Sequence, residues 1–184
     1  KPSMRLRRHT MHLDMAQLYH RNVIGDVEKM QQILLNLLQN AIDYTPYQGE
    51  IFCGIKEKPM DETTGYFEFY VQDNGVGMSE EFRKIMFEPF AREHSDRIER
   101  VEGSGLGLMI VQNLVRLLDG EIEVETKTGH GTKITVGMKL RYGTESKDAE
   151  GEIQYFDWSD WESARERKTM FSGQLHPISQ ATRR

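Results

Sequence analysis

Residues 33–46 have the sequence ILLNLLQNAIDYTP, in which apolar side chains recur at steps of three and four. This spacing predicts an α-helix with one apolar stripe, beginning near Asp26 and ending before Pro46. A second, polar stripe runs beside the first and comprises Gln32, Asn36, Asn40 and Asp43, with Tyr44 at the carboxyl end. Carboxamide oxygens in such a line suit Mg²⁺, which binds a few protein oxygens together with water and phosphates. Taken singly, each asparagine is better explained by local hydrogen bonds at a helix edge.

A glycine-containing turn follows an apolar strand at DNGVGM, residues 73–78. Asp73 ends that strand, where its carboxylate can accept a hydrogen bond from an exocyclic amine. Gly75 and Gly77 permit backbone shapes that let a flat ligand approach closely. An ordinary Asp-Asn-Gly turn has the same composition, so this segment alone leaves both interpretations open.

Two more glycine turns lie further along the chain. GSGLGL, residues 103–108, places three glycines in five residues at the start of a helix, where backbone amides bind phosphate through aligned dipoles. It is not a P-loop, because no Gly-Lys-Ser/Thr follows. It is not a dinucleotide-binding fingerprint either, because a charged segment precedes it in place of a strand. GHGT, residues 129–132, is on its own only a hairpin turn.

The segments around these motifs predict a mixture of strands and helices. Strands are expected within residues 12–24 and at 50–57, 66–72, 121–126 and 132–140, and further helices at 79–86 and 105–118. Amphipathic strands intermixed with helices favour the α/β class. The expected architecture is a two-layer sandwich in which a mixed β-sheet packs on about three helices.

Composition changes near both ends of the chain. A basic lead-in is expected at residues 1–11, one domain at 12–141, and a polar linker or tail at 142–184 with a short helix near 159–168. The tail carries four aromatic residues, Tyr155, Phe156, Trp158 and Trp161. These allow docking on the domain or on a partner, but a linker toward a further domain is the preferred interpretation.

Composition also excludes some functions. The 184 residues include 24 basic and 29 acidic side chains, a net charge of −5, so no nucleic-acid surface is expected. The single cysteine, Cys53, excludes an internal disulfide and favours a reducing, cytoplasmic setting. No apolar run reaches the length of a transmembrane helix, so this piece is expected to be soluble, while a membrane anchor in a parent protein stays open.

The order and spacing of the motifs resemble a known family. ILLNLLQNAIDYTP resembles the asparagine box of sensor histidine kinases, and DNGVGM, FEPF, GSGLGL and GHGT resemble their first glycine, phenylalanine, second glycine and third glycine boxes. All five stand in family order over residues 33–132, and with the flanking strands the resemblance covers 12–140. It implies the catalytic ATP-binding domain of these kinases, a Bergerat-type fold shared with gyrase, the Hsp90 chaperone and MutL, with ATP and Mg²⁺ as cofactors.

The resemblance implies a role for each matching residue. Asn40 matches the ligand of Mg²⁺, Asp73 the acceptor of the adenine amino group, and Tyr44 an aromatic beside the nucleotide. Residues 91–104 match the lid over the nucleotide, with Phe90 among its anchors. The nucleotide-binding positions that the resemblance implies are Asn36, Asn40, Asp43, Tyr44, Asp73, Gly75, Gly77, Phe90, Arg92, Gly103, Ser104, Gly105, Leu106, Gly107, Leu108 and Thr132.

Two positions depart from the family's pattern. Related ATP-hydrolysing members carry a glutamate where Asn36 stands, and an amide cannot act as a general base, which favours phosphoryl transfer over hydrolysis. The family often has lysine at the position of Asp43. A carboxylate there repels the nucleotide unless Mg²⁺ or an arginine offsets it, and Arg92 matches a phosphate-directed basic position.

The phosphoacceptor that the resemblance implies is missing from this chain. None of its histidines has the setting of an acceptor on a dimerisation helix, and each of them is expected on the surface or in a loop: His9, His12, His20, His94, His130 and His176. The expected partners are therefore the dimerisation and histidine-phosphotransfer domain of a parent kinase, and a response regulator or receiver domain. A gyrase-type ATPase and a nucleotide-binding module without catalysis are the alternatives. ATP turnover by the chain alone would favour the first, and binding without transfer the second.

Overall fold

The structure is a computed structural model that describes residues 9–93, 104–143 and 155–157 of the chain. Three helices are described, α1 (Val27–Tyr44), α2 (Glu80–Ile85) and α3 (Gly107–Leu117). The described strands are β1 (Thr10–Gln17), β2 (Asn22–Ile24), β3 (Glu50–Pro59), β4 (Thr64–Asp73), β5 (Glu121–Lys127), β6 (Gly131–Tyr142) and β7 (Tyr155–Asp157). Residues 1–8 of the lead-in predicted at 1–11, residues 94–103 of the predicted lid, which include Gly103, and the short helix predicted near 159–168 lie outside the described residues. Thr10 and Met11 of the predicted lead-in belong to β1 instead.

The strands form one mixed sheet, as the sequence predicts. Its order is β1-β3-β4-β6-β2-β7, and β5 pairs with β6 beside this path. β1 runs parallel to β3, whereas the other pairings are antiparallel. The parallel pair requires a crossover between the two strands, and helix α1 lies within that connection.

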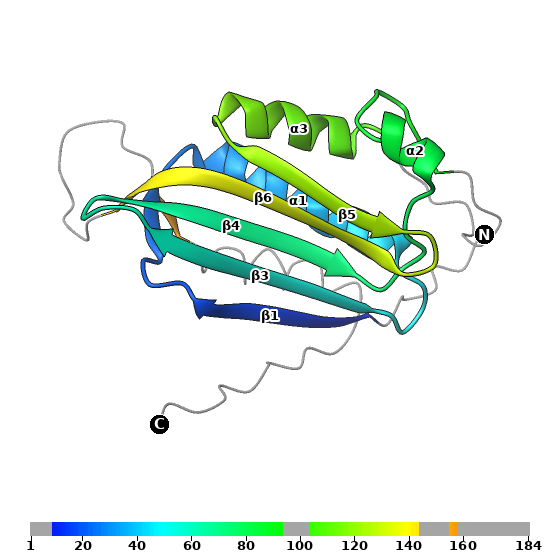
Figure 1. The fold of residues 1–184 in the computed structure, drawn as a ribbon, viewed down its shortest axis with the longest axis horizontal. Coiled ribbons are helices and arrows are strands. Elements are labelled where there is room, and N and C mark those ends of the chain that lie inside the picture. The colour runs from blue at the N-terminus through cyan, green and yellow to red at the C-terminus, as the bar shows by residue number, and fades with distance from the viewer. Residues whose placement is uncertain (1–8, 94–103, 144–154, 158–184) are drawn as a thin grey trace.

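Helices α1 and α3 lie next to each other over one face of the sheet, and α2 lies beside the amino-terminal end of α3 (Figure 1). The apolar stripe of α1 is buried as predicted: Met30, Ile33, Leu34, Leu37, Leu38 and Ala41. These side chains share one core with the inward-facing residues of the strands, such as Phe67 and Phe69 of β4. Each large side chain removed from water in this way contributes about 1.5–3 kcal/mol, so α1 is fixed by its buried face.

The helix ends follow from their capping residues. Asp26 is the N-cap of α1 and accepts a hydrogen bond of 3.0 Å from the backbone N–H of Lys29. Ser79 caps α2 in the same way, accepting from the N–H of Phe82 at 3.1 Å. Both caps stand where the sequence predicts the start of a helix.

None of the helices in the described residues is long and apolar enough to cross a membrane.

Two features differ from the sequence analysis. His9 was expected at the surface but is 2% exposed, because its ring Nε2–H donates to the carbonyl of Thr45 at 3.0 Å, just beyond α1. In addition, residues 155–157 were expected in the tail, yet they form β7. This strand pairs antiparallel with β2, so that Val23 lies opposite Phe156. Three residues of the expected tail therefore extend the sheet.

Candidate functional site

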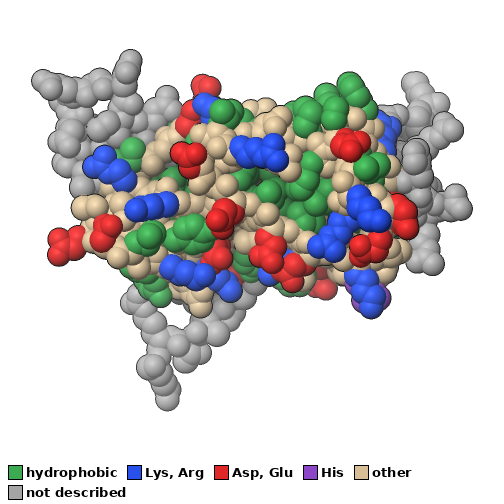
Figure 2. Space-filling model, turned by 45° about the horizontal axis from the view of Figure 1, so that its top comes forward, with side chains coloured by type: hydrophobic (Ala, Val, Ile, Leu, Met, Phe, Trp, Pro, Cys, Tyr) green, Lys and Arg blue, Asp and Glu red, His purple; other side chains and the backbone are tan. Residues whose placement is uncertain are grey.

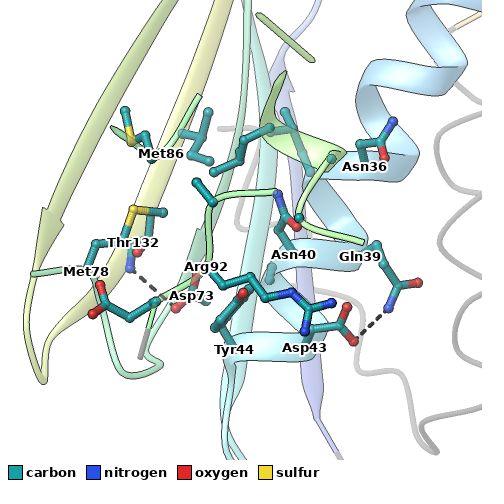
Figure 3. Close-up of a pocket in the computed structure, with 18 of the residues that line it drawn as sticks. Asn36, Gln39, Asn40, Asp43, Tyr44, Asp73, Met78, Met86, Arg92 and Thr132 are labelled. Carbon is teal, nitrogen blue, oxygen red and sulfur yellow. Dashed lines mark hydrogen bonds between the residues drawn. The ribbon is translucent and has the colours of Figure 1, made fainter. Parts of the chain in front are cut away.

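A pocket opens between the carboxyl-terminal half of α1, the ends of β4 and β6, helix α2 and the start of α3 (Figure 3). Side chains of α1 form one wall, and Asp73 of β4 lies with Thr132 of β6 on the opposite side. Its apolar lining comes from all of these elements: Leu37, Ala41, Val71, Met78, Phe82, Met86, Leu108, Ile110 and Ile134. An apolar cleft with a few polar groups at defined places is the usual form of a small-molecule site.

The polar stripe of α1 presents two carboxamides to this pocket. Asn36 donates through Nδ2 to the carbonyl of Gln32 at 2.9 Å, which leaves its Oδ1 free to face α3. Asn40 has a buried Nδ2 without a hydrogen-bond partner in the described part of the chain. A methyl group added to Gly107 would lie 3.4 Å from Asn40 Oδ1 and 3.5 Å from Asn36 Oδ1. Both amide oxygens therefore border one small space at the start of α3, kept open by a glycine.

Asp73 supplies a buried carboxylate at the other side of the pocket. Its Oδ1 accepts from the backbone N–H of Gly75 at 2.8 Å and from that of Thr132 at 3.3 Å. Burial raises the pKa of Asp73 from 3.8 to about 6, although these two hydrogen bonds lower it. The carboxylate is 8% exposed, and both donors meet the same oxygen. Its second oxygen can therefore accept from a ligand.

A chain of hydrogen bonds holds the turn that follows Asp73. The Oγ atoms of Thr132 and Thr126 are 2.9 Å apart, and Thr126 Oγ1 accepts from the N–H of Met78 at 2.9 Å. Gly77 has a φ of +66°, and a Cβ there would stand 2.0 Å from the carbonyl oxygen of Lys127. Only glycine fits this position, so the turn is fixed against the β5–β6 hairpin.

Charged residues surround the mouth of the pocket. Asp43 on α1 accepts from Gln39 Nε2 at 2.8 Å. Figure 3 shows the Arg92 side chain extended toward Asp43 and Tyr44. The pKa of Tyr44 is raised, by burial first and by the charge of Asp43 next, while Arg92 lowers it. Asp43 and Arg92 therefore act on the same hydroxyl group with opposite charges.

The structure brings most of the residues predicted for the site together. The predicted residues that line the pocket are Asn36, Asn40, Asp43, Tyr44, Asp73, Gly77, Arg92, Ser104, Gly105, Gly107, Leu108 and Thr132. Gly75 and Leu106 belong to the adjoining turns and are not in the lining. Phe90 is 72% exposed and is not in the lining either. Its φ is 65°, and its N–H donates to the Gly105 carbonyl at 3.0 Å. Gly103 lies outside the described residues.

Several lining residues were not predicted. Gln39 lies on the polar side of α1, and its spacing of four from Asp43 was the available clue. Met78, Phe82 and Met86 look like ordinary core residues in the sequence, yet they line the pocket from within α2 and from its two ends. Glu93 accepts from the N–H of Ser79 at 2.9 Å, a contact across fourteen positions that no periodicity indicates.

These features define the class of protein. The carboxamides of α1, the buried carboxylate at the end of β4 and the glycine turn opening α3 surround one cleft in an α/β sandwich, which is the arrangement of an ATP-binding domain. The sequence profile described as "Histidine kinase-, DNA gyrase B-, and HSP90-like ATPase" matches residues 25–142. The chain belongs to this family. Within it, the chain is the catalytic ATP-binding domain of a two-component histidine kinase.

Individual relatives agree with this assignment. The chain is 33% identical over 119 residues to the autoinducer 2 sensor kinase/phosphatase LuxQ of Vibrio parahaemolyticus, which covers 65% of this chain and 14% of LuxQ. It is 38% identical over 114 residues to the circadian input-output histidine kinase CikA of Thermosynechococcus vestitus, covering 62% of this chain and 15% of CikA. The solved structure of the mycobacterial sensor histidine kinase MprB is similar with a TM-score of 0.58 and 27% identity, covering 76% of this chain and 90% of that one. The chain thus spans only 14–15% of the length of these curated relatives.

Proposed function

We propose that this domain binds Mg-ATP and donates the γ-phosphate to a histidine on a separate dimerisation domain of a parent kinase, from which a receiver domain takes it. The observation that carries the proposal is the pair of amide oxygens, from Asn36 and Asn40, that border the space beside Gly107. A phosphate chain reaching this space from the adenine end would lie between α1 and the amides that open α3. We further propose a cytoplasmic setting, in keeping with the single cysteine, Cys53, which is buried.

The residues fit a magnesium ion. Mg²⁺ prefers oxygen ligands and takes few of them from the protein when phosphates and water supply the rest. Asn40 is the residue we assign to the ion, because its amide oxygen borders the space beside Gly107 and its side chain faces the pocket. Bound there, the ion would neutralise charge on the phosphates. No cluster of three or more His, Cys, Asp or Glu residues in the described ranges offers a competing metal site.

The remaining side chains have separable tasks in the proposed reaction. Asp73 holds the adenine amino group, and the apolar residues of β4, α2 and β6 exclude water from the base. The turn before α3 directs backbone N–H groups at the phosphates. Phosphoryl transfer depends mainly on positioning and charge stabilisation, which such groups supply without covalent help.

Asn36 separates this proposal from an ATPase. A hydrolase needs a base to activate water, and an amide cannot take a proton. Neither Asn36 nor Asn40 can play that part, so no base stands at the helix position where hydrolysing members of the family carry their glutamate, although Asp43, Asp73 and Glu93 also line the pocket. The domain is therefore suited to hold ATP unhydrolysed until an acceptor histidine arrives.

The binding half of the proposal is tested by Asn40→Ala. We expect this change to abolish Mg-ATP binding measured by calorimetry, because the ion loses its protein ligand. Asn113→Ala, on an exposed position of α3 outside the pocket, is the matched control and should bind as the unchanged protein does. Unchanged affinity in Asn40→Ala would refute the metal assignment.

The catalytic half is tested by mixing the chain with the dimerisation domain of its parent protein and γ-labelled ATP. We expect acid-labile label on the dimerisation domain and little free phosphate from the chain alone. Steady phosphate release that does not depend on the added domain would instead support the ATPase. Binding without transfer in the same mixture would support the module without catalysis.

A further inference from the structure

The charge of the pocket lining is unfavourable for a polyphosphate. Asp43, Asp73 and Glu93 contribute three carboxylates, and Arg92 is the one cation among the described lining residues. Carboxylates repel phosphate oxygens, and a guanidinium attracts them and binds them through paired N–H groups. The affinity for the phosphates therefore depends on where the Arg92 side chain is held.

The backbone around Arg92 is fixed on both sides. Before it, the N–H of Phe90 donates to the carbonyl of Gly105 at 3.0 Å, which ties this segment to the turn that opens α3. After it, the Glu93 carboxylate accepts from the N–H of Ser79 at 2.9 Å and from its hydroxyl at 3.2 Å. Arg92 is exposed, however, so these contacts place its Cα without fixing the end of its long side chain.

Asp43 is placed to fix that end. In Figure 3 the Arg92 side chain reaches across the mouth of the pocket toward Asp43, on the last turn of α1. Gln39, one turn earlier, donates to Asp43 Oδ1 at 2.8 Å and so orients the carboxylate. The charges of Asp43 and Arg92 also act in opposite directions on the pKa of the Tyr44 hydroxyl.

We propose that Asp43 is a positioning residue which, oriented by Gln39, holds the Arg92 guanidinium at the pocket mouth where it meets the phosphates of the nucleotide. Asp43 then acts through Arg92 and not by touching the nucleotide. The inference rests on the proposed function, since it concerns how the same site binds a nucleotide polyphosphate. It also accounts for a carboxylate at a place where phosphate repulsion alone would be unfavourable.

The two effects of Asp43 have opposite signs, which makes them separable. Its charge repels phosphates whether or not Arg92 is present. Its positioning effect exists only while Arg92 is present. Asp43→Asn should therefore weaken polyphosphate binding while Arg92 is present. When Arg92 is already replaced by glutamine, the same change should strengthen the binding or leave it unaltered.

The experiment is a double-mutant cycle of Asp43→Asn and Arg92→Gln on the full chain. The dissociation constants of ADP and of adenosine are measured by displacement of a fluorescent ATP analogue. We expect Arg92→Gln to weaken ADP about tenfold, the loss of one charge-assisted contact, and Asp43→Asn to weaken it several-fold. Adenosine, which has no phosphate, should bind all four proteins within about twofold.

Two further variants separate positioning from a general structural effect. Asp43→Glu keeps the carboxylate and should retain most of the ADP affinity. Glu123→Gln removes the same charge from an exposed position of β5, outside the pocket, and should leave all constants unchanged. Melting temperatures of the variants, measured in parallel, identify any protein that fails to fold.

The outcomes are distinct. Asp43→Asn strengthening ADP binding equally with and without Arg92 would show repulsion only and overturn the positioning role. Equal weakening of adenosine and ADP by Asp43→Asn would show a structural role and overturn it too. If neither ADP nor adenosine displaced the analogue from the unchanged chain, the proposed function itself would fail. ADP binding without coupling between Asp43 and Arg92 would overturn the positioning role alone.

Discussion

Asp73 combines two properties that oppose each other at the residue scale. As a buried acid it resists ionisation, whereas its proposed role as the acceptor for an adenine amino group favours the ionised form. Burial raises its pKa from 3.8 to about 6. Between these values the folded chain holds a proton that the unfolded chain has lost, so this group makes stability fall as pH rises from about 4 to 6. Above pH 6 the loss is complete and amounts to roughly 3 kcal/mol.

This predicts a pH dependence of adenine recognition. We expect the affinity for ADP to fall as pH is lowered from 7.5 to 5, because protonated Asp73 is a weaker acceptor and carries a hydrogen on one of its two oxygens. Calorimetry at a series of pH values measures this, and Asp73→Asn corrects for titration of the phosphates themselves. The variant should bind weakly without the Asp73 step in its profile, yet melt at a higher temperature at pH 7.5. Identical pH profiles for both proteins would contradict the assignment.

Adding a single Cβ atom at Gly107 should change fold stability and nucleotide affinity in opposite directions. A Cβ there would meet Asn40 Oδ1 at 3.4 Å and Asn36 Oδ1 at 3.5 Å, which is ordinary contact without a clash. Alanine also favours the helix by about 1 kcal/mol over glycine. We therefore expect Gly107→Ala to raise the melting temperature slightly while it weakens Mg-ATP binding by filling the space beside both amides. Gly77→Ala, whose Cβ would stand 2.0 Å from a carbonyl oxygen, should instead destabilise the fold.

At the scale of the element, α1 joins the core to the site. One face carries the buried apolar stripe, and the neighbouring face carries the amides and Asp43, so the packing of the helix fixes the position of the polar groups. Both stripes could be predicted from the sequence, because residues three and four positions apart lie on the same face of a helix. The approach of Arg92 toward α1 at the pocket mouth was not, because Arg92 comes from a distant segment of the chain.

The N-cap of α1 supports this helix and leads to an element-scale prediction. Hydrogen bonds from the Lys29 side chain and backbone N–H hold the pKa of Asp26 below 3.8. A lowered pKa means that the ionised cap stabilises the fold above about pH 4 and that this contribution is lost as pH falls through the folded pKa. Asp26→Ala should reduce the free energy of unfolding by about 1 kcal/mol at pH 7. Urea denaturation at pH 7 and pH 3 should show a smaller difference at pH 3, and an equal difference would contradict the ionic cap.

At the scale of the whole molecule, the α/β sandwich and its motifs could be predicted, but some of the sheet could not. The five motifs and the strand–helix order were visible locally, and the structure confirms them as one mixed sheet under two long helices. The burial of His9 and the pairing of β7 depend on partners far along the chain. Three residues carry too little periodicity to indicate a strand.

Figure 2 shows charges of both signs mixed over one face with hydrophobic side chains gathered between them, a distribution that composition alone does not give.

The pairing of β7 predicts a contribution of the tail to stability. Without it, the strand pairing that β2 keeps within the described residues is the one with β6, through Val23 and Ile24. A chain ending at residue 143 should therefore melt at a lower temperature than the full chain and exchange the amide hydrogens of Asn22–Ile24 faster. A chain ending at residue 157 retains β7 and is the matched control. Equal melting of the two shortened chains would show that β7 adds nothing.

The order of pairing in the sheet has a consequence during protein synthesis. Val23 lies opposite Tyr142, and the pocket needs side chains from Asn36 through to Ile134. At about 5–20 residues per second, a ribosome needs roughly 5–20 seconds to pass from α1 to β6. During that interval α1 has left the ribosome with much of its apolar face unpaired, a segment suited to a chaperone. The nascent chain therefore acquires its nucleotide site only when nearly the whole sheet has been translated.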